Sequence, residues 1–156
     1  MTASSYTVRV AAGPEDIDAC FSVRKEVFVV EQEVPAELEY DTYDTSAVHV
    51  LAVAGDGTPL GTGRLLYGAD AAGKTGAGPE VGSLGRLAVS GAARGLGIGA
   101  ALVRGIEDAA RTRGLTAIDL HAQTHALSFY ERLGYVAYGP VFLDADIDHR
   151  AMRREI

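Results

Sequence analysis

Apolar residues recur along this 156-residue chain in short runs, most of which alternate with polar positions. Such runs are typical of β-strands that bury one face or both. They predict strands at residues 6–11, 48–53, 60–67, 84–89, 117–122, 135–142 and 147–152. Tight turns at Gly55-Asp56-Gly57 and Asp144-Ala145-Asp146 join two pairs of these strands as hairpins.

Other stretches place apolar residues three and four positions apart, which is the period of an amphipathic helix. The spacing predicts helices over residues 13–28, over a short stretch after Pro35, over 100–113 and over 126–133. Asp41 to Asp44 forms an acidic turn, and the glycine-rich stretch from Gly68 to Pro79 is expected to be a mobile surface loop.

The order of these elements predicts an α/β fold whose mixed sheet is flanked by helices. The length suits one domain over residues 1–156, and 47% hydrophobic with 22% charged residues is typical of a globular chain. No apolar run approaches the ~20 residues of a membrane span, and the N-terminus has no signal-peptide pattern. We therefore expect a cytoplasmic protein.

Charge and cysteine content narrow the function classes. A net charge of −7 disfavours nucleic acid as a partner and mildly favours cationic substrates. The single cysteine, Cys20, excludes an internal disulfide and a cysteine-rich metal site. It falls in an apolar helical stretch, so we expect a buried structural thiol and no metal.

The most informative stretch is a glycine-studded turn between the strand at 84–89 and the following helix. Arg94, Gly97 and Gly99 spell R-x-x-G-x-G. Glycines let a ligand approach backbone amides, and a helix that starts at those amides favours negative charge. The turn predicts a phosphate or pyrophosphate site, but it lacks the Gly-Lys-Ser/Thr of a P-loop and the G-x-G-x-x-G of a dinucleotide-binding fold.

This turn resembles the coenzyme A turn, [RQ]-x-x-G-x-[GA], of the GNAT acetyltransferase superfamily. Residues Ala126 to Tyr135 resemble a second GNAT motif, A-x-x-[FL]-Y-x-x-x-G-[FY], and follow in the expected order. The ElaA-type branch of this superfamily is suggested by Arg24, by Val27 to Gln32, by His49, by Ala122 to His125, and by His149 with Met152.

The resemblance implies a GNAT-type fold with a largely antiparallel sheet that splays between the central strand and the next, parallel strand. The pantetheine arm of acetyl-CoA would bind in that splay. The residues implied to bind this cosubstrate are Leu87, Ala88, Val89, Arg94, Gly95, Leu96, Gly97, Ile98, Gly99, Ala100, Gln123, Phe129 and Tyr130.

The implied reaction is direct transfer of an acetyl group to an amine of a small molecule or peptide. Tyr130 matches the family tyrosine that protonates the leaving thiolate. The general base stays open among Glu31, Glu33, His121, His125, His149 and water. Our expectation places the amine between residues 29–35 and the closing hairpin, where Glu31 attracts the ammonium group and His149 accepts its proton.

Two rival interpretations remain at the level of the sequence. Arg24, Phe28, Asp41, Asp44 and Arg64 resemble the N-terminal pattern of acyl-homoserine-lactone synthases, which use S-adenosylmethionine. A non-catalytic acyl-CoA-binding module would keep the glycine turn but would not need Tyr130. The acceptor amine, the acyl-chain preference and the choice between monomer and homodimer are not determined by these patterns.

Overall fold

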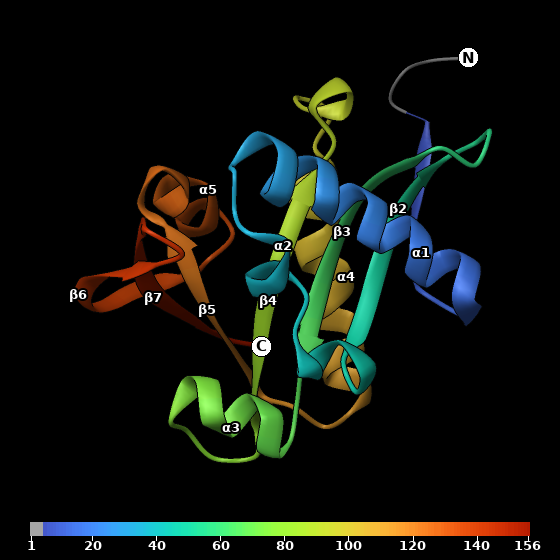
Figure 1. The fold of residues 1–156 in the computed structure, drawn as a ribbon. Helices are drawn as coiled ribbons and strands as arrows, with labels where there is room; N and C mark the ends of the chain where they lie inside the picture. The colour runs from blue at the N-terminus through green and yellow to red at the C-terminus, as the bar shows by residue number, and fades with distance from the viewer. Residues whose placement is uncertain (1–4) are drawn as a thin grey trace.

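The computed structural model describes residues 5–156, whose seven strands form one mixed sheet (Figure 1). The strand order is β1-β2-β3-β4-β5-β7-β6, and only the β4–β5 pair is parallel. This arrangement confirms the predicted α/β class. The strands are β1 (Tyr6–Val10), β2 (Val48–Ala54), β3 (Pro59–Leu66), β4 (Val81–Val89), β5 (Ala117–Gln123), β6 (Val136–Asp144) and β7 (Ile147–Glu155).

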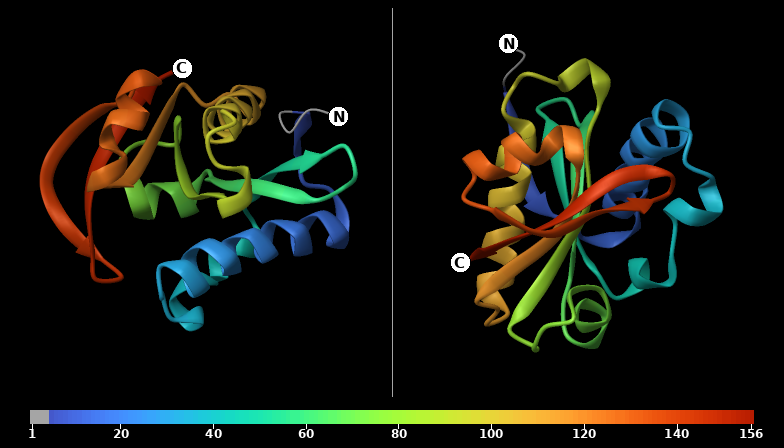
Figure 2. Two further views of the ribbon diagram at one scale, coloured as in Figure 1. Left: turned by 90° about the horizontal axis from the view of Figure 1, so that it is seen from above. Right: turned by 90° about the vertical axis from the view of Figure 1, so that its left-hand side faces the viewer.

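Helices cover both faces of the sheet, with α1 on one face and α4 on the other (Figure 2). The α-helices are α1 (Gly13–Arg24), α2 (Ala36–Glu39), α3 (Ala69–Thr75), α4 (Ile98–Thr112) and α5 (Leu127–Arg132). A π-helix, η1 (Lys25–Glu31), continues α1, and short 3₁₀ turns occupy Thr42–Thr45, Gly91–Ala93 and Thr124–Ala126. Within residues 5–156 no helix is both long and apolar enough to cross a membrane.

The main core lies between α4 and the sheet. The apolar stripe of α4 places Ile98, Leu102 and Ile106 in this core with at most 1% of each exposed. Gly61 of β3 lets the helix approach closely, since an added Cβ would lie 2.8 Å from Leu102 Cδ1. On the other face Cys20 is fully buried beside Leu51 and Val53, as expected of a structural thiol.

Two local predictions are wrong. The first helix does not keep its α-helical period to Phe28, because it widens into a π-helix at Lys25, which rotates the following side chains relative to α1. The stretch predicted as a mobile loop contains α3 between Gly68 and Gly76, both of which have positive φ. Three alanines favour that helix, and Asp70 anchors it by accepting a 2.6 Å hydrogen bond from Ser46.

The predicted splay is present between β4 and β5. They pair only from Val81 with Ala117 to Leu84 with Leu120. Beyond Leu84, β4 carries one extra residue relative to β3, and Arg86 there has φ +54°. This bulge bends β4 where it leaves β5, so the two strands open a space between them.

Candidate active site

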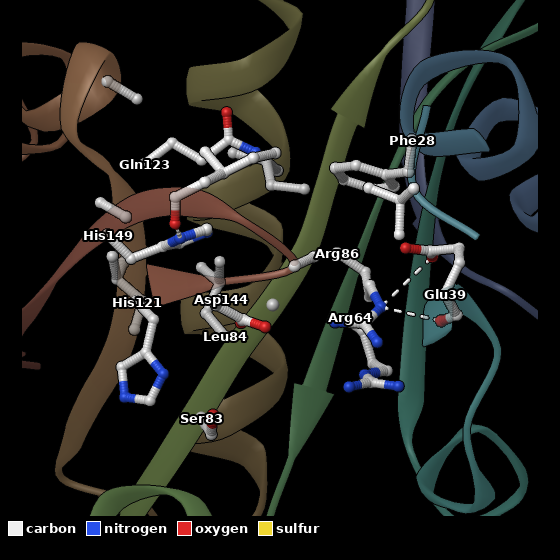
Figure 3. A pocket seen from close by; sticks show the side chains of 18 of the residues that line it. Phe28, Glu39, Arg64, Ser83, Leu84, Arg86, His121, Gln123, Asp144 and His149 are labelled. Carbon is white, nitrogen blue, oxygen red and sulfur yellow. Dashed lines mark hydrogen bonds and ion pairs between the residues drawn. The ribbon is translucent and has the colours of Figure 1, made fainter. Parts of the chain in front are cut away.

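A cavity of about 640 Å³ occupies the space beside the opened strands (Figure 3). Phe28 lines it from η1, Gln32 from just after η1, Arg86 from the bulge of β4, and His149 from β7. Polar side chains therefore converge from both sides of the splay. The predicted wall between residues 29–35 and the closing hairpin is only part of the lining, because α2, β3 and α3 also contribute.

A second hollow, a groove of about 340 Å³, follows the end of β4 to the start of α4. Many of the residues predicted to bind coenzyme A line it: Leu87, Val89, Arg94, Gly95, Gly97, Ile98, Gly99, Ala100 and Phe129. Leu87 and Phe129 line both hollows. The groove and the cavity thus meet at these two side chains.

The remaining predicted coenzyme residues lie elsewhere. Ala88 is buried against Val23 and Val27, and Leu96 packs against the main core. Gln123 and Tyr130 line the cavity. The side chain of Ala88 therefore points away from the groove, and only its backbone could contact a ligand there.

Glycine geometry shapes the turn before α4. Gly95 and Gly97 have φ of +85° and +80°, values that side chains disfavour. Gly97 caps α4, whose first amides have no partner within the helix. Gly99 packs closely against Phe129, so that an added Cβ would be only 3.2 Å from the ring. The turn can therefore hold its amides toward an anion in the groove.

The structure corrects the expected position of Glu31. Its carboxylate accepts hydrogen bonds of 2.6 and 2.8 Å from Arg94, at the glycine-rich turn. The hydrogen bond from Arg94 lowers the pKa of Glu31. The π-helical turn directs Glu31 toward Arg94, which lines the groove, whereas Gln32 next to it lines the cavity. Glu31 therefore lies beside the glycine-rich turn and not in the cavity.

Tyr130 lies at the junction of the groove and the cavity. It is 8% exposed and contacts Phe129 edge to face, with 4.9 Å between ring centroids. Burial raises the pKa of Tyr130 well above its usual value. The phenol therefore keeps its proton at neutral pH, as a proton donor must.

His149 presents one nitrogen as a base. Its Nδ1 lies 2.7 Å from the carbonyl oxygen of Ile147. A carbonyl only accepts, so we assign the proton to Nδ1 and the lone pair to Nε2. Phe142 stacks on the ring with 6.0 Å between centroids, and Figure 3 shows the imidazole directed into the cavity.

The other candidate bases differ in their surroundings. His121 lines the cavity, and burial lowers its pKa although Asp119 opposes that effect. His125 lies 2.6 Å from the Gln123 oxygen, whose amide nitrogen donates to Gln32 at 2.9 Å. Glu33 is exposed and has φ +59°. His125 and His149 both line the cavity with one tautomer fixed by a carbonyl oxygen, but His125 is exposed whereas His149 is buried.

A buried ion network, which sequence reasoning missed, forms the wall opposite His149. Arg24 is fully buried and pairs with Glu39 and Asp44 at 2.7 Å each. Arg64 pairs with Asp44 at 2.9 Å and with Asp41 at 2.7 Å. Four of these residues stood out in the sequence through the synthase-like pattern, but nothing marked Glu39 as their partner.

Arg86 joins the network from the cavity side. Its guanidinium approaches Glu39 and Asp41, each at 3.2 Å (Figure 3). Its backbone is left-handed at the bulge, and its side chain is directed toward Glu39 (Figure 3). No local sequence signal identifies a non-glycine residue in this conformation, so Arg86 could not be recognised beforehand.

Opposing effects set the acidities in the network. Burial alone would raise the pKa of Asp44, but hydrogen bonds from Arg24 and Arg64 outweigh it and hold the pKa at about 2. Burial raises the pKa of Glu39, and its arginine neighbours offset this only in part. Asp44 is therefore the carboxylate that the arginines stabilise most clearly.

Comparison with known proteins agrees with this geometry. Residues 16–135 match the model of the acetyltransferase (GNAT) family. The uncharacterized N-acetyltransferase YjcF of Bacillus subtilis is 36% identical over 147 residues, which cover 94% of this chain and 97% of that protein.

Solved structures extend the likeness. An acyl-CoA N-acyltransferase from Pseudomonas aeruginosa superposes with a TM-score of 0.77 at 35% identity, covering 96% of this chain and 98% of that one. Escherichia coli ElaA superposes with a TM-score of 0.79 at 26% identity, covering 97% and 99% of the two chains.

The ion network generates a stability prediction. We expect Asp44→Asn to lower the free energy of unfolding at pH 7 by about 3 kcal/mol, because Arg24 and Arg64 lose a buried partner. Chemical denaturation measures this change. Asp108→Asn, which removes an exposed carboxylate paired with Arg111, is the control and should change stability by less than about 1 kcal/mol.

The same carboxylate makes stability depend on pH. The folded pKa of about 2 lies below the ordinary 3.8, so Asp44 stabilises the fold above about pH 4. That contribution, about 2 kcal/mol, is lost as the pH falls through 2. Asp44→Asn should therefore lose less stability than wild type on acidification, and equal losses would contradict the assignment.

Proposed function

Since the chain belongs to the acetyltransferase (GNAT) family, we propose that it transfers an acetyl group from acetyl-CoA directly to an amine of a small molecule or peptide. Family membership carries the broader activity, acyl-CoA-dependent N-acyl transfer. The junction of groove and cavity at Leu87 and Phe129, beside Tyr130, supports direct transfer. We further propose that residues 1–156 act as a single domain.

In this proposal the groove holds acetyl-CoA. The pyrophosphate binds the amides of residues 94–100, where the start of α4 favours an anion. Arg94 exchanges the carboxylate of Glu31 for a phosphate oxygen. The pantetheine arm lies along Leu87 to Val89, where β4 no longer pairs with β5. Glu31 thus holds Arg94 at the turn only until the coenzyme binds, and it has no part in binding the acceptor.

The cavity holds the amine. Its neutral nitrogen attacks the thioester carbonyl carbon, the carbon–sulfur bond breaks, and Tyr130 gives its proton to the departing thiolate. The amine must lose protons, and Nε2 of His149 accepts one directly or through water. A thiol relay does not suit this site, because Cys20 is fully buried in a separate cluster beside Leu51.

Binding of coenzyme A tests the groove. We expect Arg94→Gln to weaken the affinity for coenzyme A about tenfold, because it removes a charged hydrogen bond to the pyrophosphate. Titration calorimetry measures the affinity. Arg111→Gln removes another arginine that is paired with a carboxylate, near the far end of α4, and should bind as wild type does. Equal affinity of the folded Arg94→Gln variant would place the coenzyme elsewhere.

Release of free thiol from acetyl-CoA with a panel of amines tests catalysis. Tyr130→Phe deletes only the hydroxyl, so kcat should fall roughly 10²- to 10⁴-fold while coenzyme affinity stays near wild type. Full activity of this variant would reduce Tyr130 to a packing residue. Tight acetyl-CoA binding by wild type without turnover of any amine would favour a non-catalytic acyl-CoA-binding module.

The assigned base predicts a dependence on the acceptor. We expect His149→Ala to lower kcat roughly 10²-fold for an amine that is protonated at neutral pH. The loss should be much smaller for trifluoroethylamine, which is largely neutral there and needs no deprotonation before attack. His125→Ala is the matched control, because His125 contacts Gln123 at the edge of the cavity. Equal losses for both amines would contradict the role of His149.

A further inference from the structure

Two charged side chains of the cavity remain without an ion-pair partner among residues 5–156. Lys74 of α3 and Asp144 at the end of β6 both line the cavity, and neither takes part in a salt bridge between described residues. The ammonium of Lys74 lies over the Tyr43 ring, 5.2 Å from its centroid. Both residues are exposed, and Asp41 and Asp144 act on Lys74 through space without an ion pair to it, so the cavity offers a ligand one cation and one anion that have no contacting partner.

The wall that carries Lys74 is positive on balance. The three arginines of the ion network face three carboxylates, so the network is neutral and Lys74 is an additional positive charge. Arg64 also has a buried Nε–H without an acceptor in the described chain. Burial lowers the pKa of Lys74, Arg64 and Arg86 add to that effect, and Asp41 and Asp144 oppose it. An anionic group of a ligand would be stabilised beside Lys74 and Arg86.

Asp144 faces this wall from the closing hairpin. Ala145 and Asp146 both have positive φ, as the two central residues of a tight hairpin turn do. The turn directs the carboxylate of Asp144 into the cavity, between His149 and Leu84 (Figure 3). A cationic group could be held there within reach of an anion bound at Lys74.

The charged end of the cavity is separated from the acetyl-transfer end. Ser83 and Leu84 line the cavity where β4 still pairs with β5, next to the end that α3 covers. Leu87 marks the junction with the groove. Leu87 lies four positions after Ser83, a separation of at most roughly 13 Å that the bulge at Arg86 shortens. A reactive amine at Tyr130 would therefore lie several bonds from a head group bound at Lys74 and Asp144.

We propose that the acceptor is a diamino acid, with its carboxylate on Lys74 and Arg86, its α-ammonium on Asp144 and its side-chain amine at Tyr130. This inference rests on the proposed acetyl transfer. The side-chain nitrogen forms an amide bond to the acetyl carbon as the carbon–sulfur bond breaks. The side-chain ammonium loses two protons: one leaves to solvent through His149, and the other restores Tyr130 after its proton has gone to the thiolate, so the products are the Nω-acetyl amino acid, coenzyme A and a proton.

Three amines with the same five-carbon spacing test the head group. L-Lysine carries both charges, 6-aminohexanoate lacks the α-amino group and 1,5-diaminopentane lacks the carboxylate. We expect kcat/KM for lysine to exceed that of each analogue about tenfold, one charged contact being lost in each. Lys74→Met should abolish the preference for lysine over diaminopentane. Asp144→Asn should abolish the preference for lysine over aminohexanoate. Mass spectrometry of the product should place the acetyl group on the side-chain nitrogen.

Matched controls and a binding measurement make the test decisive. Lys25→Met changes the only other lysine, and Asp148→Asn an exposed carboxylate on the same hairpin; both should keep the wild-type preferences. Calorimetry with coenzyme A present should show lysine binding to wild type about tenfold more tightly than to Lys74→Met.

The possible outcomes separate the inference from the proposed function. Lysine binding that depends on Lys74, with no thiol released from any amine, would support the subsite and contradict the transferase. Diaminopentane acetylated as well as lysine would overturn the subsite and leave the transferase standing. Lysine that neither binds nor reacts would overturn the subsite. So would a Lys74→Met variant that is faster with all three amines, because Lys74 and Asp144 would then only close the cavity.

Discussion

The buried ion network is the interaction on which the acceptor side of this protein depends. Arg24 leaves α1 and meets Glu39 of α2 and Asp44 of the following turn, so one side chain joins three segments. Burying such charges has a large desolvation cost, and the net stabilisation of a buried pair over an apolar one is often small. The main effect of the ion network is on geometry. It holds α1, α2 and the following turn in the one arrangement in which every arginine contacts its carboxylates.

The opposite face of the sheet is stabilised differently. Here α4 packs its apolar stripe on the strands, and Gly61 brings the helix close to β3. Rigid packing of this kind fixes the start of α4, and with it the amides before Ala101, relative to the end of β4. The groove side is therefore held by apolar contacts and the cavity side by ion pairs, with the splay of β4 and β5 between them.

Charge is divided in the same way. On the coenzyme side Arg94 is the cation nearest the glycine turn, and Glu31 neutralises it. On the cavity side the network is neutral as a whole, so the acceptor selectivity that we propose rests with two groups outside it, Lys74 and Asp144. Between the two sides, Tyr130 is kept neutral by burial and His149 is held in one tautomer by a backbone carbonyl. The proton transfers that we propose would thus take place between two electrostatically distinct regions.

The sequence alone determined the α/β class of the fold, the glycine turn and the helix after it, and it singled out Tyr130. Each of these depends on residues close together in the chain, where hydrophobic period and glycine positions are visible directly. Only the tertiary structure decided the acceptor cavity. Arg24 and Arg86 are 62 positions apart and meet through Glu39, the π-helical turn sets which side Glu31 faces, and α3 brings Lys74 to the opening. Buried charges pair with whichever opposite charges lie near them in space. When those partners come from distant segments, the pairing produces no periodic pattern in the sequence.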